Sequence, residues 1–222
     1  MHELEISSVM HTFGMKKLLS DVYLKVQTGE IIGLLGRNGS GKTTLMNIIF
    51  GILKPDSRII RFDGQYFKRL YTEKNTISFL PQHTFIPRDL SVEKAITLMG
   101  ETTGITHRIS ENRIINSLLK KKIRELSDGE LRFLEIFLIL ESDSEFSLLD
   151  EPFTGLAPIY QEQIQEKIKM TGKRKGLIIT DHMYRNVLDI CDKIVLLKNG
   201  MTIEIKDKSQ LIEFEYLPSG KA

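Results

Sequence analysis

One stretch of the chain decides how the rest is interpreted: Gly36-Arg37-Asn38-Gly39-Ser40-Gly41-Lys42-Thr43. It fits the phosphate-loop pattern GxxxxGK followed by Ser or Thr, without a mismatch. Its glycines let backbone N–H groups turn inward around a polyphosphate, and the following helix directs its positive end at the same anion. A plain Gly/Ser turn is the other interpretation. The loop, however, follows the apolar run Ile31–Leu35 and precedes a predicted helix over Lys42–Phe50, which is the context that the pattern requires.

The side chains of this loop indicate which ligand it takes. Lys42 would hold the β- and γ-phosphates of a nucleotide, and Thr43 would give its hydroxyl to Mg²⁺. The loop therefore predicts a site for a polyphosphate together with Mg²⁺. The predicted nucleotide-binding residues of this stretch are Gly36, Arg37, Asn38, Gly39, Ser40, Gly41, Lys42, Thr43 and Thr44.

Two carboxylates supply the second half of the predicted site. Asp150 and Glu151 follow the apolar run Phe146–Leu149. A carboxylate at the end of a buried strand can hold a Mg²⁺-bound water, the role predicted for Asp150. Glu151, one residue later, points elsewhere and can polarise an attacking water. Strand ends often carry acidic residues as caps, so the pair alone would be weak evidence for a metal site. Its occurrence together with the glycine loop favours the metal-binding interpretation.

Composition and charge limit the class of protein. The chain has 222 residues, with 31 Lys and Arg against 29 Asp and Glu, which is too balanced to predict polyanion binding. Its single cysteine, Cys191, forms no internal disulfide. The longest apolar runs, such as Phe133–Leu140, fall well short of the about 20 residues of a membrane span. The start lacks a signal peptide's basic flank and apolar stretch, so we expect a cytosolic protein.

The pattern of apolar residues predicts an α/β fold, a mostly parallel sheet with helices on both faces. Ser91 to about Ile123 is predicted to be helical, with helix starts at Ser91 and Ser110, and to be inserted into the α/β core. Ser127 and Glu130 predict a capping box. The strands are expected at Val22–Val26, Ile31–Leu35, Arg58–Phe62, Ile77–Leu80, Phe146–Leu149, Leu177–Thr180, Ile194–Leu197 and Thr202–Ile205. The other helices are expected at Lys42–Phe50, Ser127–Leu140, Ile159–Met170 and Met183–Ile190.

Five landmarks in order give a family resemblance over nearly the whole chain. Gln82 matches a Q-loop glutamine, Leu126-Ser127-Asp128-Gly129-Glu130 is similar to the signature LSGGQ, and Asp150-Glu151-Pro152 matches a Walker B acidic pair with its proline. His182 stands where a switch histidine is expected, and Phe13 where an aromatic residue stacks on adenine. In these motifs the chain resembles the nucleotide-binding subunit of an ATP-binding cassette (ABC) transporter.

The resemblance implies an architecture and further site residues. The fold would be a P-loop NTPase (RecA-like) core with an N-terminal antiparallel β part, in one ATPase domain over residues 1–222, with a helical subdomain inserted at about residues 83–125. Gln82 would reach Mg²⁺ and the attacking water, and His182 would bond the γ-phosphate. Ser127 and Gly129 would face the γ-phosphate held by a second copy, so that two chains enclose two nucleotides. The implied catalytic residues are Glu151, His182, Lys42 and Gln82, the implied metal-binding residues Thr43, Gln82 and Asp150, and the implied adenine contact Phe13.

Two residues depart from the family pattern. Asp128 replaces the first glycine of the signature and brings a carboxylate near a phosphate, where like charges repel. Ala157 stands where the family commonly has an aspartate in its D-loop, a residue that affects communication between the two sites. The 45 positions from Gln82 to Ser127 are also somewhat few for the family's helical subdomain.

The resemblance implies an ATP-hydrolysing subunit that drives a separate transmembrane permease from the cytoplasmic face of the membrane. The second ATPase subunit would be an identical chain or a relative, and no nucleic-acid partner is expected. Two alternatives stay open: a non-transport ABC ATPase that acts on ribosomes or DNA, and a nucleotide-gated module with little hydrolysis, motivated by Asp128 and Ala157. The stretches at residues 150–158 and 180–182 resemble the subgroup with lipopolysaccharide-export and branched-chain amino-acid-uptake ATPases.

Overall fold

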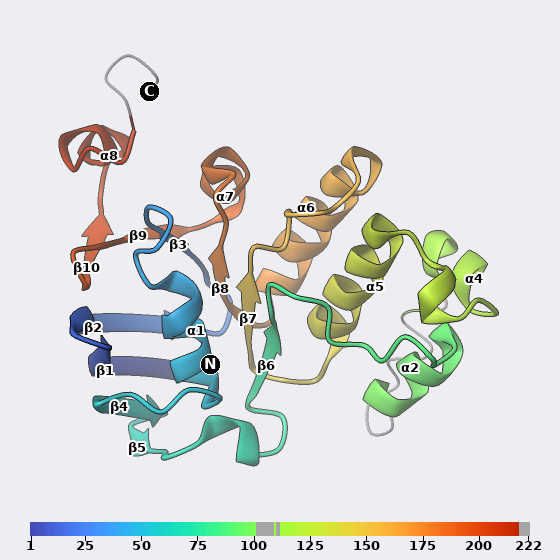
Figure 1. The fold of residues 1–222 in the computed structure, drawn as a ribbon, viewed down its shortest axis with the longest axis horizontal. Helices are drawn as coiled ribbons and strands as arrows, with labels where there is room; N and C mark the ends of the chain where they lie inside the picture. The colour runs from blue at the N-terminus through green and yellow to red at the C-terminus, as the bar shows by residue number, and fades with distance from the viewer. Residues whose placement is uncertain (101–108, 110–111, 218–222) are drawn as a thin grey trace.

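The computed structural model describes residues 1–100, 109 and 112–217 (Figure 1). The strands are β1 Glu3–Phe13, β2 Lys16–Gln27, β3 Ile31–Leu35, β4 Ser57–Phe62, β5 Gln65–Tyr66, β6 Ile77–Leu80, β7 Phe146–Asp150, β8 Gly176–Thr180, β9 Lys193–Lys198 and β10 Met201–Ile205. The α-helices are α1 Lys42–Phe50, α2 Val92–Gly100, α4 Arg113–Leu118, α5 Asp128–Glu141, α6 Pro158–Gly172, α7 Tyr184–Ile190 and α8 Lys208–Glu213. Two short 3-10 helices are η1 Leu70–Thr72 and η2 Ile123–Glu125.

The strands form one mixed sheet in the order β5-β4-β1-β2-β10-β9-β3-β8-β7-β6. The five strands from β9 to β6 pair in parallel, as the alternation of strands and helices predicts. At the other end, β1 pairs antiparallel with β2 and β4, and β4 pairs antiparallel with β5. The predicted parallel core with an N-terminal antiparallel part is confirmed.

The parallel strands are buried on both faces, because helices cover each side. In β8, Leu177 and Ile179 belong to a core shared with α5 and α6, whereas Ile178 between them belongs to a core shared with α1. Successive side chains of a strand point to opposite faces, so an uninterrupted apolar run serves two cores at once. This packing holds the carboxyl ends of the parallel strands in a common edge.

The N-terminal strand β1 is longer and less regular than the apolar pattern indicates. Leu4 and Ile6 are buried with period 2, but the next buried residue is Val9. The register shifts between Ile6 and Val9, and Ser8 has a φ of 52°. An extra residue in a strand reverses which side chains face the core. We did not predict a strand over Glu3–Phe13, because this irregularity interrupts the alternation.

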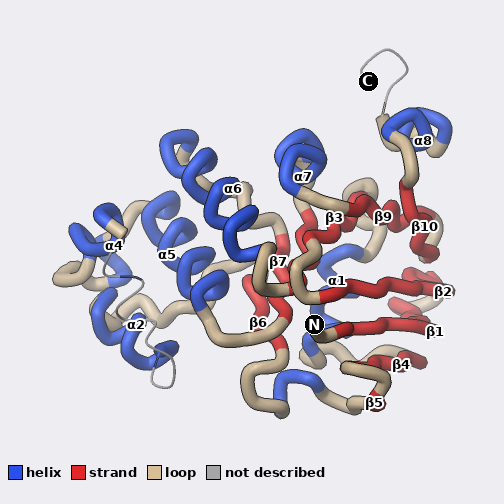
Figure 2. Tube along the Cα trace, turned by 180° about the vertical axis from the view of Figure 1, so that it is seen from behind, coloured by secondary structure: helices blue, strands red, loops and turns tan. Residues whose placement is uncertain are grey.

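Helices α2 and α4 lie beyond α5, away from the sheet (Figure 1, and from behind Figure 2). Ser91 accepts a bond from Lys94 N just before α2, so the predicted helix start there is confirmed. The predicted start at Ser110 lies outside the described residues; α4 begins after Asn112, whose side chain caps Ile114 N and Ile115 N. Across the described parts of the chain, the helices are too short or too polar to cross a membrane.

Candidate active site

The predicted site residues gather where the parallel strands end. The phosphate loop follows β3, and Gln82 follows β6. Asp150 is the last residue of β7, Glu151 comes directly after it, and His182 follows β8. In open α/β sheets, ligands bind outside the carboxyl ends of the strands. A cavity of about 480 Å³ lies there. Its lining is Leu18, Asn38, Gly39, Gly41, Lys42, Thr43, Thr44, Gln82, Glu151 and His182.

The phosphate loop depends on close backbone approach. A Cβ on Gly36 would lie 2.6 Å from Ser40 Oγ and 2.8 Å from the carbonyl oxygen of Leu197. Gly41 ends the loop at a φ of 105°, in the left-handed region that side chains disfavour. Lys42 Nζ folds back over the loop and donates to the carbonyl oxygen of Gly36 at 2.7 Å. These contacts support a turn that wraps tightly while keeping one ammonium group at its centre.

The loop leaves the N-terminus of α1 open to an anion. Gly41 provides no side-chain cap, and the first turn of α1 holds no acidic residue. Lys42 is buried, and this burial lowers the pKa of its ammonium group, while Glu151 and Asp150 oppose the shift. The helix end therefore combines free N–H groups with a partly desolvated cation, a combination suited to a phosphate.

Asp150 is fully buried beside the loop. Its Oδ1 accepts a bond of 2.6 Å from Thr180 Oγ1, while its Oδ2 has no partner within the described parts of the chain. Burial raises the pKa of this carboxyl, and the hydroxyls of Thr180 and Thr43 oppose that rise. The carboxyl therefore lies close to both threonine hydroxyls, and its Oδ2 has no hydrogen-bond donor within the described parts of the chain.

Glu151 has a different environment from its neighbour. Its φ of 50° turns the side chain away from the direction of Asp150, into the cavity. Gln82 Nε2 donates to Glu151 Oε2 at 2.9 Å, Thr154 Oγ1 lies 3.4 Å from the same oxygen, and His182 Nδ1 lies 3.6 Å from it. Three side chains from three loops thus converge on one carboxylate.

We did not predict the residues that support this arrangement. Thr180 holds Asp150, and Thr154 links Glu151 to His182 Nδ1 at 3.4 Å. Asp181 is buried and accepts bonds from Phe153 N and Met183 N, so it holds the two loops together. Burial raises the pKa of Asp181. Only their position in the sequence could have indicated these three residues, because each lies within four residues of Glu151 or His182.

The predicted signature residues lie apart from this cavity. Ser127 accepts a bond from Glu130 N, and the Glu130 carboxylate accepts from Ser127 N, so the predicted capping box is confirmed. Gly129 packs against the loop between β7 and α6, since a Cβ on Gly129 would lie 3.1 Å from the Cβ of Ala157. Neither Ser127 nor Gly129 lines the cavity that holds Lys42.

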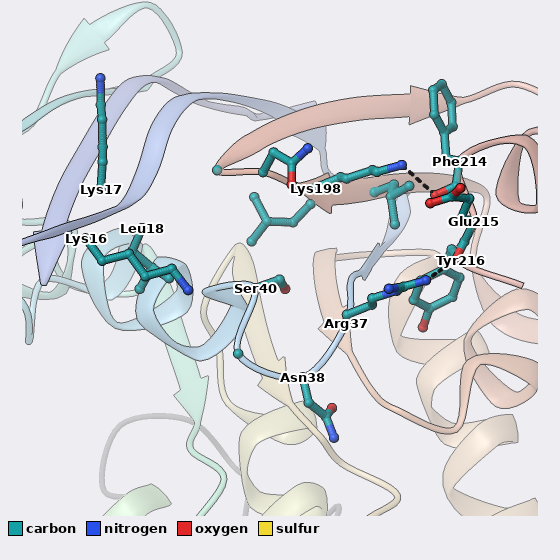
Figure 3. Close-up of a pocket in the computed structure, with 15 residues that line it drawn as sticks. Lys16, Lys17, Leu18, Arg37, Asn38, Ser40, Lys198, Phe214, Glu215 and Tyr216 are labelled. Carbon is teal, nitrogen blue, oxygen red and sulfur yellow. Dashed lines mark hydrogen bonds between the residues drawn. The ribbon is translucent and has the colours of Figure 1, made fainter.

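A second cavity of about 740 Å³ lies behind the phosphate loop (Figure 3). The Arg37 side chain extends into it and donates to the carbonyl oxygen of Glu215 at 2.7 Å, so Arg37 does not line the cavity of about 480 Å³ beside Lys42. Lys198 donates to the carbonyl oxygen of Phe214. Phe13 lines neither cavity and is 77% exposed, although its cross-strand neighbour Lys16 lines this one.

Known proteins resemble this chain along nearly its whole length. A family model described as "ABC transporter" matches residues 19–154. A "Probable ABC transporter ATP-binding protein" of Azorhizobium caulinodans is 34% identical over 213 residues, which cover 90% of this chain and 76% of that protein. The "Lipopolysaccharide export system ATP-binding protein LptB" of Haemophilus influenzae is 32% identical over 225 residues, which cover 96% and 93%. A solved "ATP binding subunit of ABC transporter" shares the fold with a TM-score of 0.81 at 23% identity, covering 97% of this chain and 95% of that one.

Proposed function

The chain belongs to the ABC transporter family as an ATP-binding subunit that hydrolyses ATP, and on this premise we propose how its residues divide the work. Lys42 and the amides of the phosphate loop bind the β- and γ-phosphates. Glu151 accepts a proton from the attacking water, while Gln82 and His182 orient that water and the γ-phosphate. The observation that carries this assignment is the convergence of Gln82, Thr154 and His182 on the Glu151 carboxylate beside Lys42.

A divalent cation fits the neighbouring position. Mg²⁺ commonly takes one or two carboxylates together with phosphate oxygens and waters. The Oδ2 of Asp150, which has no hydrogen-bond partner among the described residues, is a carboxylate oxygen of this kind; the Thr43 hydroxyl interacts with the same carboxyl group, and Gln82 lines the cavity. Mg²⁺ held by Thr43, Asp150 and Gln82 would offset the negative charge of the phosphates.

The active form in this proposal is a pair of identical chains. Ser127 and Gly129 do not line the cavity around Lys42 of their own chain, so in this proposal the N-terminus of α5 contacts a triphosphate bound to the other chain. ATP closes the pair and hydrolysis reopens it. Phe13, exposed at the end of β1, would stack on the adenine base.

A transmembrane permease is the proposed partner, reached from the cytoplasmic face. The helical insertion at about residues 83–125 of the single ATPase domain would transmit closure to it. The subgroup resemblance and the Haemophilus influenzae relative favour a role like lipopolysaccharide export. The relatives named above are transporter subunits, so action on ribosomes or DNA is not favoured. The converged Glu151 argues against a module with little hydrolysis.

The test is the variant Glu151→Gln, compared with Glu166→Gln on the exposed face of α6. Loss of a general base costs about 10²- to 10⁴-fold in rate, so steady-state hydrolysis by the first variant should fall by about that factor. Its equilibrium affinity for ATP should change little, since the phosphate loop is intact. Hydrolysis at the wild-type rate would remove Glu151 from its proposed role.

A further inference from the structure

One buried arginine contacts both loops that carry the proposed water-activating residues. Arg132 lies one turn into α5 and is 5% exposed. Its Nη1 donates to the carbonyl oxygen of Pro81 at 2.8 Å, and its Nη2 donates to the carbonyl oxygens of Asp150 at 2.9 Å and Glu151 at 3.0 Å. A single guanidinium therefore joins the loop after β6 to the end of β7.

These carbonyls belong to the peptides that set the site's geometry. Pro81 directly precedes Gln82, whose amide contacts the Glu151 carboxylate. The Glu151 backbone is held at a φ of 50°, which is costly for a residue with a side chain and persists only where its surroundings fix it. Thr180 O accepts from Glu151 N at 2.8 Å on one side, and Arg132 binds the carbonyl oxygen on the other.

Glu135, one turn further along α5, completes the arrangement. It is fully buried, and its Oε1 accepts a bond of 2.8 Å from Phe85 N, three residues after Gln82. Its Oε2 lies 3.5 Å from Arg132 Nη1. Burial raises the pKa of the Glu135 carboxyl, while the N–H groups of Phe85 and Ile86 and the charge of Arg132 oppose the rise.

The same helix carries a second buried carboxylate at its other end. Glu141, at the C-terminal end of α5, pairs with Lys167 of α6 and with Arg174 just after it. These ion pairs join α5 to α6 and to the segment that follows α6. A buried ion pair is weak evidence for stability alone, because desolvation offsets much of its attraction. The two clusters thus differ in their position along α5: Arg132 contacts the segments after β6 and at the end of β7, whereas Glu141 pairs with residues in and after α6.

We propose that Arg132 and Glu135 are positioning residues for ATP hydrolysis. Arg132 holds the Glu151 backbone in its left-handed conformation and Gln82 beside it, while Glu135 holds Arg132 and anchors the segment after Gln82. Neither residue lines the cavity beside Lys42, and the pair acts through Glu151 and Gln82. The inference therefore rests on the proposed role of Glu151.

The test uses the full chain with ATP and Mg²⁺, in the variants Arg132→Lys and Glu135→Gln. Lysine keeps the charge but loses the planar fork that reaches three carbonyls. A small misplacement of a reacting group costs up to about 10²-fold in rate, so kcat should fall by about 10- to 100-fold. The KM and the ATP affinity should stay within about 2-fold, because the phosphate loop is untouched. The matched control Glu141→Gln should leave kcat within about 2-fold even where it lowers Tm.

The outcomes separate this inference from its premise. If Glu151→Gln itself retains wild-type hydrolysis, the proposed function fails first. If Glu151→Gln is inactive while Glu135→Gln and Arg132→Lys retain wild-type kcat, the positioning role is overturned. A loss of kcat as large in Glu141→Gln would overturn it as well. Combining Arg132→Lys with Glu151→Gln should lower hydrolysis no further than Glu151→Gln alone, and a further tenfold loss would contradict action through Glu151. Should Arg132→Lys fail to fold, the nearly isosteric Glu135→Gln carries the test.

Discussion

In the proposed mechanism, the N-termini of α1 of one chain and of α5 of the other contact the same triphosphate. The two helix ends differ in their capping and in the charge of their first turns. At α1 the first turn lacks acidic residues, and Gly41 supplies no cap. At α5 the first turn carries Asp128 and Glu130, and Ser127 is engaged with Glu130. The first helix end is open to an anion, whereas the second already holds one of its own.

The closed state of the α5 end is measurable in its contacts. Glu130 Oε2 accepts from Ser127 N at 2.8 Å and from Ser127 Oγ at 2.9 Å, and Lys121 Nζ lies 3.3 Å from Glu130 Oε1. These bonds lower the pKa of Glu130, with the Ser127 N–H as the largest cause. A phosphate that approaches Ser127 must compete with this carboxylate. We therefore expect ATP to bind at α1 first and to engage α5 more weakly.

The largest effect should come from breaking the open end. Lys42→Ala removes the buried ammonium that follows Gly41. A hydrogen bond to a charged group contributes about 1.5–3 kcal/mol, so the affinity for ATP should fall by about 10- to 100-fold. Equilibrium binding of ATP measures the change, with Lys169→Ala on the exposed surface of α6 as the control. An unchanged affinity would contradict the assignment of the triphosphate to this loop.

The N-terminus of α6 is a third helix end, and it lacks a side-chain cap. Ala157 is its N-cap residue and makes no side-chain bond. Ala157→Asp should cap the helix and raise the free energy of unfolding by about 1 kcal/mol, as caps of this type do. Thermal or denaturant unfolding measures the gain. Ala157→Leu, which cannot cap, should give none, and an equal gain there would show that capping is not the cause.

The smallest effect should come from opening the closed end. Asp128→Gly removes a carboxylate from the first turn of α5 and restores the family's residue. A charge in the first turn is worth about 0.3–1 kcal/mol, so the ATP-dependent pairing of two chains should strengthen by about 2- to 5-fold. Sedimentation of the Glu151→Gln background with and without Asp128→Gly measures it. Asp128→Asn removes only the charge and should act in the same direction; weaker pairing in both variants would contradict the repulsion.

How far the sequence predicts this molecule depends on how local each feature is. The phosphate loop and the Ser127–Glu130 capping box are contained in a few consecutive residues, and both have the predicted local structure. The sequence also predicts the positions of Asp150 and Glu151. The φ of Glu151, which directs its side chain away from that of Asp150, depends on contacts with Thr180 and with Arg132.

Features that depend on distant partners were not predictable in this way. Arg132 looks like an ordinary helix residue until the fold brings Pro81 and Glu151 to it, from 51 and 19 positions away. In β1 the irregularity at Ser8 hid the strand from an analysis of periodicity. The role of Phe13 was predicted from the family resemblance. Its side chain is exposed and lines neither cavity, so stacking on adenine stays a prediction.

The central claim is that one chain's phosphate loop and another chain's Ser127 hold the same triphosphate. The most direct measurement mixes two variants that we expect to hydrolyse little ATP on their own, Lys42→Ala and Ser127→Arg, and follows ATP hydrolysis. In a mixed pair, one of the two sites combines an intact loop with an intact Ser127. We predict that hydrolysis returns on mixing. A mixture that forms pairs in sedimentation but stays as inactive as the separate variants would contradict it.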